Sequence, residues 1–222
     1  ISTCATNDIA TYYERTGSGP PLVFVHGGWL DQRMWAPQVE EFDEQYEVIT
    51  YDVGGHGRTW GSAEKRYTVE LFAADLLSLV EALDVERPVV CGLSLGGMIA
   101  QTYAARYPTR LRALVLVDTA VSARLTLTDT IQTLLFPKWA MTATVRLLGP
   151  KGWAAIAFRL ATLTRGENWF GRDESVQSYV REAMEAFSTA EYNKVFGAIY
   201  DFRMVDLQAI DVQTLVLNGE FS

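Results

Sequence analysis

The chain has 222 residues, of which 49% are hydrophobic and 21% are charged, so it holds enough apolar material for one well-buried domain. Its formal net charge of −8 argues against a nucleic-acid partner. No stretch approaches the roughly 20 apolar residues that a membrane-spanning helix needs, so we expect no membrane insertion.

Short continuous apolar runs recur along the chain and predict β-strands. Each run is followed by histidine, aspartate, glycine or asparagine, and the runs cover residues 22–25, 48–51, 88–91, 114–117 and 214–217. Such runs are typical of strands that are buried on both faces of a parallel sheet.

Helical patterns lie between these runs. Apolar residues recur at helical spacing from Val69 to Leu83, and Thr68 is placed to cap that helix. Residues 95–107 form a second helical stretch, which Pro108 closes. Strands that alternate with helices imply parallel pairing through right-handed crossovers, so the fold class is α/β with a doubly wound, mostly parallel sheet.

Residues 119–210 interrupt this alternation. The region is rich in helix formers and contains Trp139, Trp153, Phe158, Trp169, Phe170, Tyr179 and Phe187. We interpret it as an inserted helical cap over the carboxyl ends of the strands. The alternative is a set of ordinary outer helices whose aromatic residues form their own core. The cap divides the chain into a core at 1–118, the cap at 119–210 and a resumed core at 211–222.

The sequence Gly92-Leu93-Ser94-Leu95-Gly96 matches GxSxG between a predicted strand and a predicted helix. A serine on so tight a turn projects from the sheet, and side chains two positions before and after it would collide. The turn also places the Leu95 N–H at a helix N-terminus, where it faces a developing oxyanion. The alternative for the motif alone is a glycine-rich turn that binds phosphate.

A second motif, His26-Gly27-Gly28, follows the first apolar run, where this kind of site has its other oxyanion donor. The N–H of Gly28 is the first candidate donor. Trp29 is the second, and it is also a candidate substrate contact. We expect His26 to brace the loop rather than to transfer protons.

Further motifs occur in a characteristic order. They are HGG at 26–28, Met34-Trp35, the DVGGHGRT loop at 52–59, GLSLGG at 92–97, Tyr107-Pro108, the LVLVD run at 114–118 and the strand that ends in Asn218-Gly219-Glu220. Together they resemble the α/β-hydrolase superfamily over nearly the whole chain. Met98 after the paired glycines resembles the esterase, lactonase and C–C-bond hydrolase branches, which need no cofactor. The resemblance implies that the loop with Asp52 and His56 is structural and flanks the pocket.

A serine nucleophile needs a base, and in this fold an acid and then a histidine follow the serine. The acid position that the resemblance implies falls on Ser222. Glu220 lies slightly early, and Asp118 is another acid position, although a loop-capping role for Asp118 is favoured. No histidine follows Ser94. We expect that the natural protein continues for about 40–60 residues, as typical element lengths suggest. The alternative is a non-catalytic relative.

Other patterns narrow the function. With only two histidines, His26 and His56, we expect no metal site, and no cofactor motif is found. The two cysteines, Cys4 and Cys91, do not suggest a disulfide framework, and the first residues lack a signal-peptide pattern, so we expect a cytoplasmic protein.

The sequence therefore predicts a cofactor-independent serine hydrolase that uses Ser94 to cleave an ester-like or lactone bond of a small, largely apolar substrate. The 222 residues alone are expected to be inactive. The alternative function is small-molecule binding without catalysis.

Overall fold

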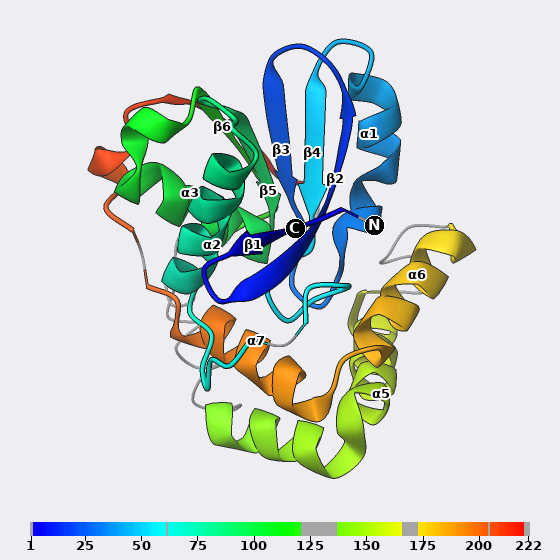
Figure 1. Cartoon of the computed structure of the whole chain (residues 1–222). Helices are drawn as coiled ribbons and strands as arrows, with labels where there is room; N and C mark the ends of the chain where they lie inside the picture. Colours follow the sequence, from blue (N-terminus) through cyan, green and yellow to red (C-terminus); the bar gives the residue numbers. More distant parts are fainter. Residues whose placement is uncertain (1, 61, 121–136, 166–172, 204, 220–222) are drawn as a thin grey trace.

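The computed structural model describes residues 2–60, 62–120, 137–165, 173–203 and 205–219 (Figure 1). Seven strands form one sheet in the order β1-β2-β4-β3-β5-β6-β7. Their bounds are β1 Thr3–Thr6, β2 Ile9–Gly17, β3 Pro21–Val25, β4 Glu47–Tyr51, β5 Val89–Leu93, β6 Ala113–Val117 and β7 Gln213–Leu217. Strands β3 to β7 pair in parallel, whereas β1 and β2 pair antiparallel. The predicted doubly wound, mostly parallel sheet is confirmed.

Alternate residues of the central strands face opposite sides of the sheet. In β3, Val23 and Val25 join the cluster formed with helices α2 (Val69–Ala82) and α3 (Leu95–Arg106). Leu22 and Phe24 join a smaller cluster around Trp35 on the other side, where helix α1 (Ala36–Phe42) lies (Figure 1). Strands covered on both faces must be apolar throughout, which explains the continuous runs.

The expectation of burial on both faces is wrong for β7. Leu215, Val216 and Leu217 are 53%, 57% and 46% exposed. This strand is last in the sheet order and pairs only with β6. Its sequence is typical of a buried strand, but its side chains are exposed because it lies at the edge of the described sheet.

The helix signals in the sequence are confirmed. The Thr68 hydroxyl accepts a hydrogen bond from the Leu71 N–H at 3.1 Å, which caps α2. Helix α3 ends at Arg106, and the short 3₁₀ helix η2 (Pro108–Arg110) follows after one residue. Two further 3₁₀ helices are η1 (Gln32–Trp35) and η3 (Leu207–Ala209).

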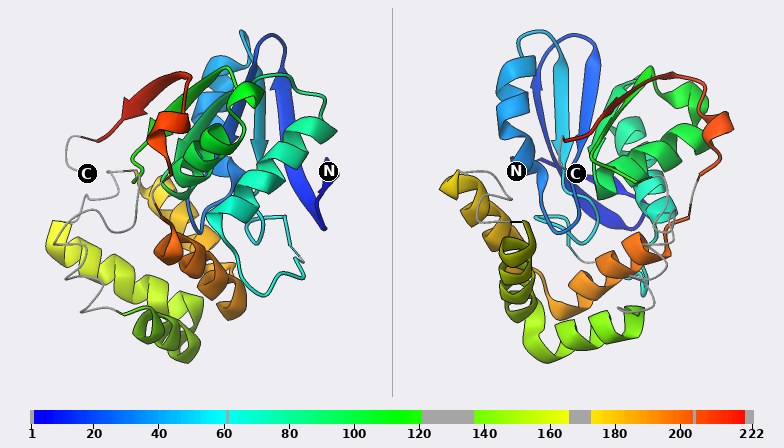
Figure 2. Two further views of the ribbon diagram at one scale, coloured as in Figure 1. Left: turned by 90° about the vertical axis from the view of Figure 1, so that its left-hand side faces the viewer. Right: turned by 180° about the vertical axis from the view of Figure 1, so that it is seen from behind.

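Between β6 and β7 the described residues form three α-helices, α5 (Lys138–Arg165), α6 (Glu174–Glu185) and α7 (Thr189–Asp201), besides η3. They fall in the segment that the sequence predicts to be a cap, and we call these three helices the cap below. Helix α5 is kinked, because Gly149 has a φ of 69° and Pro150 follows it. The cap lies at the end of the sheet where β3 leads into residues 26–30, as the views in Figures 1 and 2 agree. None of the described helices has the length and apolar content needed to cross a membrane.

Cap and core are joined mainly by buried side chains. Phe187, Tyr192 and Val195 are at most 6% exposed and belong to the same cluster as the sheet residues. Two polar contacts also join cap and core. The Tyr67 hydroxyl donates to Glu191 at 2.5 Å, and the Arg33 guanidinium pairs with Glu182 at 3.1 Å. Exposed ion pairs stabilise little, so apolar burial carries most of this attachment.

The cap aromatics do not all face one pocket. Trp139 is 74% exposed, whereas Phe187 is buried against His56. The Tyr179 hydroxyl is used by Asp31, whose carbonyl accepts from it at 3.0 Å. Trp169 and Phe170 lie outside the described residues. Aromatic content alone therefore does not define the substrate pocket.

Candidate active site

Ser94 lies on the turn between β5 and α3 with φ 52° and ψ −112°. This is an unfavourable conformation for a residue with a side chain. Backbone contacts hold it: the Ser94 N–H donates to the Val117 carbonyl at 3.0 Å, and the Ser94 carbonyl accepts from the Thr119 hydroxyl at 2.7 Å. The side chain does not cap the helix that follows, and the residue is exposed. A strained backbone that is held by two hydrogen bonds thus presents a hydroxyl for which no partner is found among the described residues.

The two glycines of the motif are required by contact distances. A Cβ at Gly92 would lie 2.2 Å from the Gly96 carbonyl oxygen, and a Cβ at Gly96 would lie 2.1 Å from the Val25 carbonyl oxygen. Neither distance is possible for a carbon atom, so both positions need glycine. This is the collision that the sequence predicts for GxSxG.

The loop after β3 brings Gly28 beside Leu95. A Cβ built at Gly28 would lie 3.7 Å from Leu95 Cβ and 3.0 Å from Ile199 Cδ1 of α7. Among the described residues, the Gly28 N–H donates no backbone hydrogen bond. The Leu95 N–H is at the first position of α3, where no intrahelical acceptor exists. The two residues that carry the candidate donors are therefore neighbours, and Leu95 directly follows Ser94.

Trp29 follows with a φ of 59° and turns its ring toward the cap. The indole stacks on Tyr192 with ring centroids 4.9 Å apart, and its Nε1–H points at the Tyr192 carbonyl at 3.5 Å. The residue is half-buried. The candidate substrate contact thus lies between the 26–28 loop and helix α7.

The expected bracing role of His26 is confirmed. Its Nε2 accepts from the Val53 N–H at 2.9 Å, and its Nδ1 lies 2.8 Å from the Gly27 carbonyl oxygen, which needs a proton on Nδ1. The side chain is fully buried, and burial lowers the pKa of His26. The ring is therefore neutral, and both nitrogens are engaged.

His56 lies behind this ring. The His56 ring centroid is 5.0 Å from that of His26 and 5.1 Å from that of Phe187. Its Nδ1 is 3.1 Å from the Gly54 carbonyl oxygen, and Nε2 has no partner among the described residues. Burial is the main reason that the pKa of His56 falls to about 3. Neither histidine hydrogen-bonds to Ser94 in the part of the chain that is described.

The acidic candidates differ in position. Both carboxylate oxygens of Asp52 are used by backbone, accepting from the Gln32 N–H at 2.8 Å and the Arg58 N–H at 2.7 Å. Burial raises the pKa of Asp52. The Asp118 Oδ1 accepts from the Gly219 N–H at 2.7 Å, which is a loop-capping contact. Glu220 and Ser222 lie outside the described residues.

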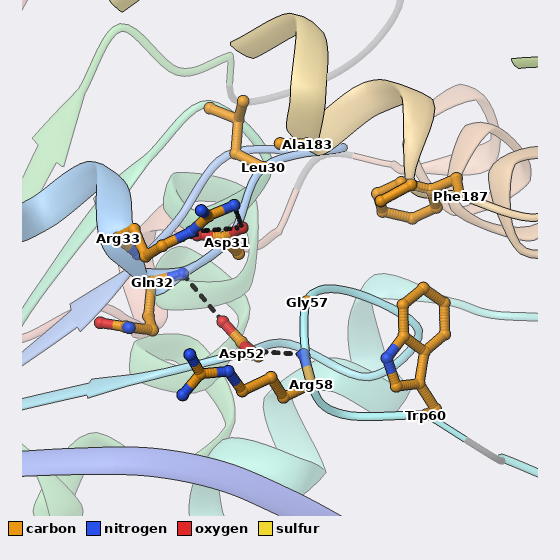
Figure 3. Close-up of a pocket in the computed structure, with 11 residues that line it drawn as sticks. Leu30, Asp31, Gln32, Arg33, Asp52, Gly57, Arg58, Trp60, Ala183 and Phe187 are labelled. Atoms are coloured by element: carbon orange, nitrogen blue, oxygen red, sulfur yellow. Dashed lines mark hydrogen bonds and ion pairs between the residues drawn. The ribbon is translucent and has the colours of Figure 1, made fainter. Parts of the chain in front are cut away.

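A separate pocket of about 240 Å³ opens between residues 30–33, the loop at 57–60 and helix α6 (Figure 3). Ser94 is not among its lining residues. Asp31 and Arg33 form one wall, and their contact with Tyr179 and Glu182 ties the loop to the cap. Burial alone would raise the pKa of Asp31, but hydrogen bonds from Arg33 outweigh it and lower that pKa. Sequence reasoning missed this pair, for which the short Asp-x-Arg spacing before a 3₁₀ helix is the only local signal.

Comparison with known proteins agrees with the fold. A family model described as the alpha/beta hydrolase fold matches residues 20–221. Over 120 residues the chain is 29% identical to 3-oxoadipate enol-lactonase 2 of Acinetobacter baylyi, a match covering 53% of this chain and 45% of the relative. Over 124 residues it is 35% identical to 2-hydroxy-6-oxo-2,4-heptadienoate hydrolase of Pseudomonas putida, covering 54% and 45%. The matches thus span just under half the length of these relatives.

Solved structures extend the likeness to the whole chain. The enol-lactonase from Burkholderia xenovorans LB400 superposes with a TM-score of 0.72 at 26% identity, covering 99% of this chain and 81% of that one. A thermophilic esterase from Thermogutta terrifontis gives a TM-score of 0.78 at 27% identity, covering 99% and 79%.

Proposed function

The chain belongs to the alpha/beta hydrolase family, and from this premise we propose that it is a cofactor-independent serine hydrolase acting through an acyl-enzyme on Ser94. The observation that carries the proposal is the strained, exposed Ser94 with Gly28 and Leu95 beside it, where the Gly28 N–H donates no backbone hydrogen bond among the described residues. Packing does not explain a serine in this conformation, because the residue is exposed and glycine would adopt the same φ without strain.

The reaction follows from this placement. The Ser94 hydroxyl oxygen attacks the carbonyl carbon while a base takes its proton, and the carbonyl oxygen becomes an oxyanion held by the Gly28 and Leu95 N–H groups. The carbonyl re-forms, and the alcohol leaves with the proton returned by the base. Water, activated by the same base, then releases the acid and restores Ser94. The base must be a group other than His26 and His56, because both rings are buried and neither hydrogen-bonds to Ser94 among the described residues.

For the substrate we propose a small, largely apolar ester or lactone. Trp29 and Tyr192 supply aromatic surface next to the proposed oxyanion donors, and apolar walls with few polar groups are usual for such sites. Similarity to proteins named as enol-lactonases and an esterase supports this class.

We further propose the division into a core at 1–118, a cap at 119–210 and a resumed core at 211–222, with no nucleic-acid or membrane partner. The net charge of −8 supports the absence of a nucleic-acid partner. Cys4 and Cys91 are both free, which supports a cytoplasmic location.

The test is labelling of the complete natural protein with a fluorophosphonate probe, followed by peptide mapping. We expect label on Ser94 alone and none in Ser94→Ala. Ser18→Ala, which changes an exposed serine on the β2–β3 turn, should label like the wild type. Label on another serine would refute the assignment.

A second candidate is small-molecule binding without cleavage. It is favoured by one observation: among the described residues, no base contacts the Ser94 hydroxyl. The two functions separate in the complete protein. Binding of a hydrolysable ester without turnover and without probe label supports the second candidate.

A further inference from the structure

A basic groove lies between cap helices α5 and α7 and the core segment 65–66. It has a volume of about 510 Å³ and is formed by residues 65–66, the first half of α5 and one face of α7. Its lining residues are Lys65, Arg66, Lys138, Thr142, Arg146, Thr189, Ala190, Asn193, Lys194 and Gly197. Volumes of this size fit small molecules.

The charge of the groove opposes the charge of the chain. Five of the ten lining residues are lysine or arginine and none is acidic, whereas the whole chain has 27 acidic and 19 basic residues. A concave cluster of one sign concentrates ions of the opposite sign. The distribution therefore points to an anion.

Several of the cations are held in place. The Asp201 carboxylate accepts from Arg66 at 2.6 Å and also from Lys138, which joins the 65–66 segment to α5. Lys194 pairs with Glu191 at 2.9 Å, and its ammonium lies 5.0 Å from the Tyr67 ring centroid. Two acids thus position three cations and leave net positive charge.

The remaining two cations are available for a ligand. Lys65 and Arg146 are exposed, and neither forms an ion pair within the described part of the chain. Asn193 also lines the groove, and its side-chain amide NH₂ is a group that can donate to an anion. Gly197 keeps the space open, since a Cβ there would lie 3.5 Å from the Lys138 ammonium.

The groove is distinct from the Ser94 site. Residues 189, 190, 193, 194 and 197 lie on one face of α7, while Tyr192, Val195 and Ile199 on its other face pack toward the core. Ile199 is the residue that approaches Gly28. The helix therefore separates the two sites.

We propose that this groove binds a small molecule with at least two negative charges, carried by phosphate or carboxylate groups. Multiple charges are needed to engage cations from three separate segments. Such contacts are charge-assisted and are strong where the cations are already positioned. This proposal does not depend on hydrolase activity.

Calorimetric titration of the purified protein with pyrophosphate and with citrate tests it. We expect one site for at least one of the two anions, with a Kd that rises between low and physiological ionic strength (~0.15 M). Arg146→Glu and Lys65→Glu should each raise Kd at least tenfold. Both residues are exposed and unpaired within the described chain, so these variants should keep the thermal unfolding midpoint.

Arg106→Glu is the matched control. It makes the same change in net charge at an exposed position at the end of α3, and it should leave Kd unchanged. The anion that binds identifies phosphate or carboxylate as the ligand group. No binding of either anion, or equal weakening by Arg106→Glu, would overturn the proposal. Tighter competing binding of a short single-stranded RNA would overturn the small-molecule assignment.

Discussion

The indole of Trp29 stacks on the ring of Tyr192, with centroids 4.9 Å apart and planes inclined by 18°. These residues are far apart in sequence: one follows the HGG loop of the core, and the other lies in cap helix α7. Because Trp29 directly follows Gly28, the stack links the position of the cap to the position of a proposed oxyanion donor.

Trp29→Ala should weaken this link. Removing a half-buried indole should lower the free energy of unfolding by roughly 2 kcal/mol, less than the ~3–5 kcal/mol of a fully buried aromatic side chain. Trp29→Phe retains a ring for Tyr192 and should cost less than about 1 kcal/mol. Urea unfolding measures both. In the complete protein, KM for an apolar ester should rise more in Trp29→Ala than in Trp29→Phe. Equal losses in the two variants would show that the stack is unimportant.

Ser94→Gly should stabilise the protein while removing its nucleophile. The φ of 52° at Ser94 costs about 1–3 kcal/mol in a residue with a Cβ, partly offset by the greater unfolded-state freedom of glycine. We expect a net gain of about 1 kcal/mol in urea unfolding. Ser94→Ala retains the strain and should change stability by less than about 0.5 kcal/mol. A destabilised Ser94→Gly would mean that the turn is relaxed in the wild type.

Gly28→Ala and Gly28→Pro distinguish two effects on catalysis, the loss of the Gly28 N–H and the addition of side-chain atoms at this position. The alanine methyl would press on the flexible end of Ile199 at 3.0 Å and meet Leu95 at an ordinary contact distance of 3.7 Å, and the N–H remains. Proline removes the N–H. In the complete protein, Gly28→Pro should lower kcat/KM by about 100-fold or more, the usual cost of one oxyanion donor. Gly28→Ala should lose less than about tenfold. A folded and fully active Gly28→Pro excludes this donor.

His56 should make the fold sensitive to acid. Its pKa is about 3 in the folded state because of burial, against ~6.5 in the unfolded chain. Below pH 6.5 the unfolded state therefore binds a proton that the folded state does not, and stability falls as pH falls. Each pH unit costs about 1.4 kcal/mol, so we expect a loss of about 2 kcal/mol between pH 6.5 and pH 5 from this residue.

His56→Gln should flatten that slope, as measured by urea unfolding at a series of pH values. His26 contributes in the same direction, because burial also lowers its pKa, so a smaller slope should remain. An unchanged slope in His56→Gln would contradict a buried neutral His56.

The features that sequence predicted correctly are local in origin. The need for glycine at position 92 follows from a contact within a few residues, because a Cβ there would lie 2.2 Å from the Gly96 carbonyl oxygen. The Thr68 cap involves a residue three positions away. Continuous apolar runs predicted the parallel strands, because strands covered on both faces admit few polar residues.

The features that sequence missed join distant segments. The Tyr179 hydroxyl meets Asp31 across 148 positions, and the basic groove combines residues 65–66 with two cap helices. No local sequence pattern predicts such long-range contacts, since they depend on how the cap packs against the core. The exposure of β7 was missed for a similar reason. An apolar run shows that a strand could be buried on both faces, but it does not show whether the strand lies in the middle or at the edge of the sheet.

The 222-residue chain alone should hydrolyse p-nitrophenyl butyrate only at the residual level that binding and oxyanion stabilisation provide, on the order of 10³ over water. At neutral pH the Ser94 hydroxyl is un-ionised and needs a base. His26 is engaged at both ring nitrogens, and His56 is buried with a pKa of about 3, so neither can take the proton. If the nucleophile and oxyanion donors are already in place, however, a base from solution should restore part of the activity.

Imidazole added to the buffer supplies such a base, and it also hydrolyses the ester by itself. Its effect must therefore be compared with the same titration of Ser94→Ala, which retains the fold but not the nucleophile. We expect a steeper increase with imidazole in the wild-type chain than in Ser94→Ala, and a wild-type response in His56→Ala. Equal slopes in the wild type and Ser94→Ala would show that Ser94 is not poised for attack. Substantial turnover without imidazole, abolished by His56→Ala, would instead identify His56 as the base and refute its assignment as a buried neutral ring.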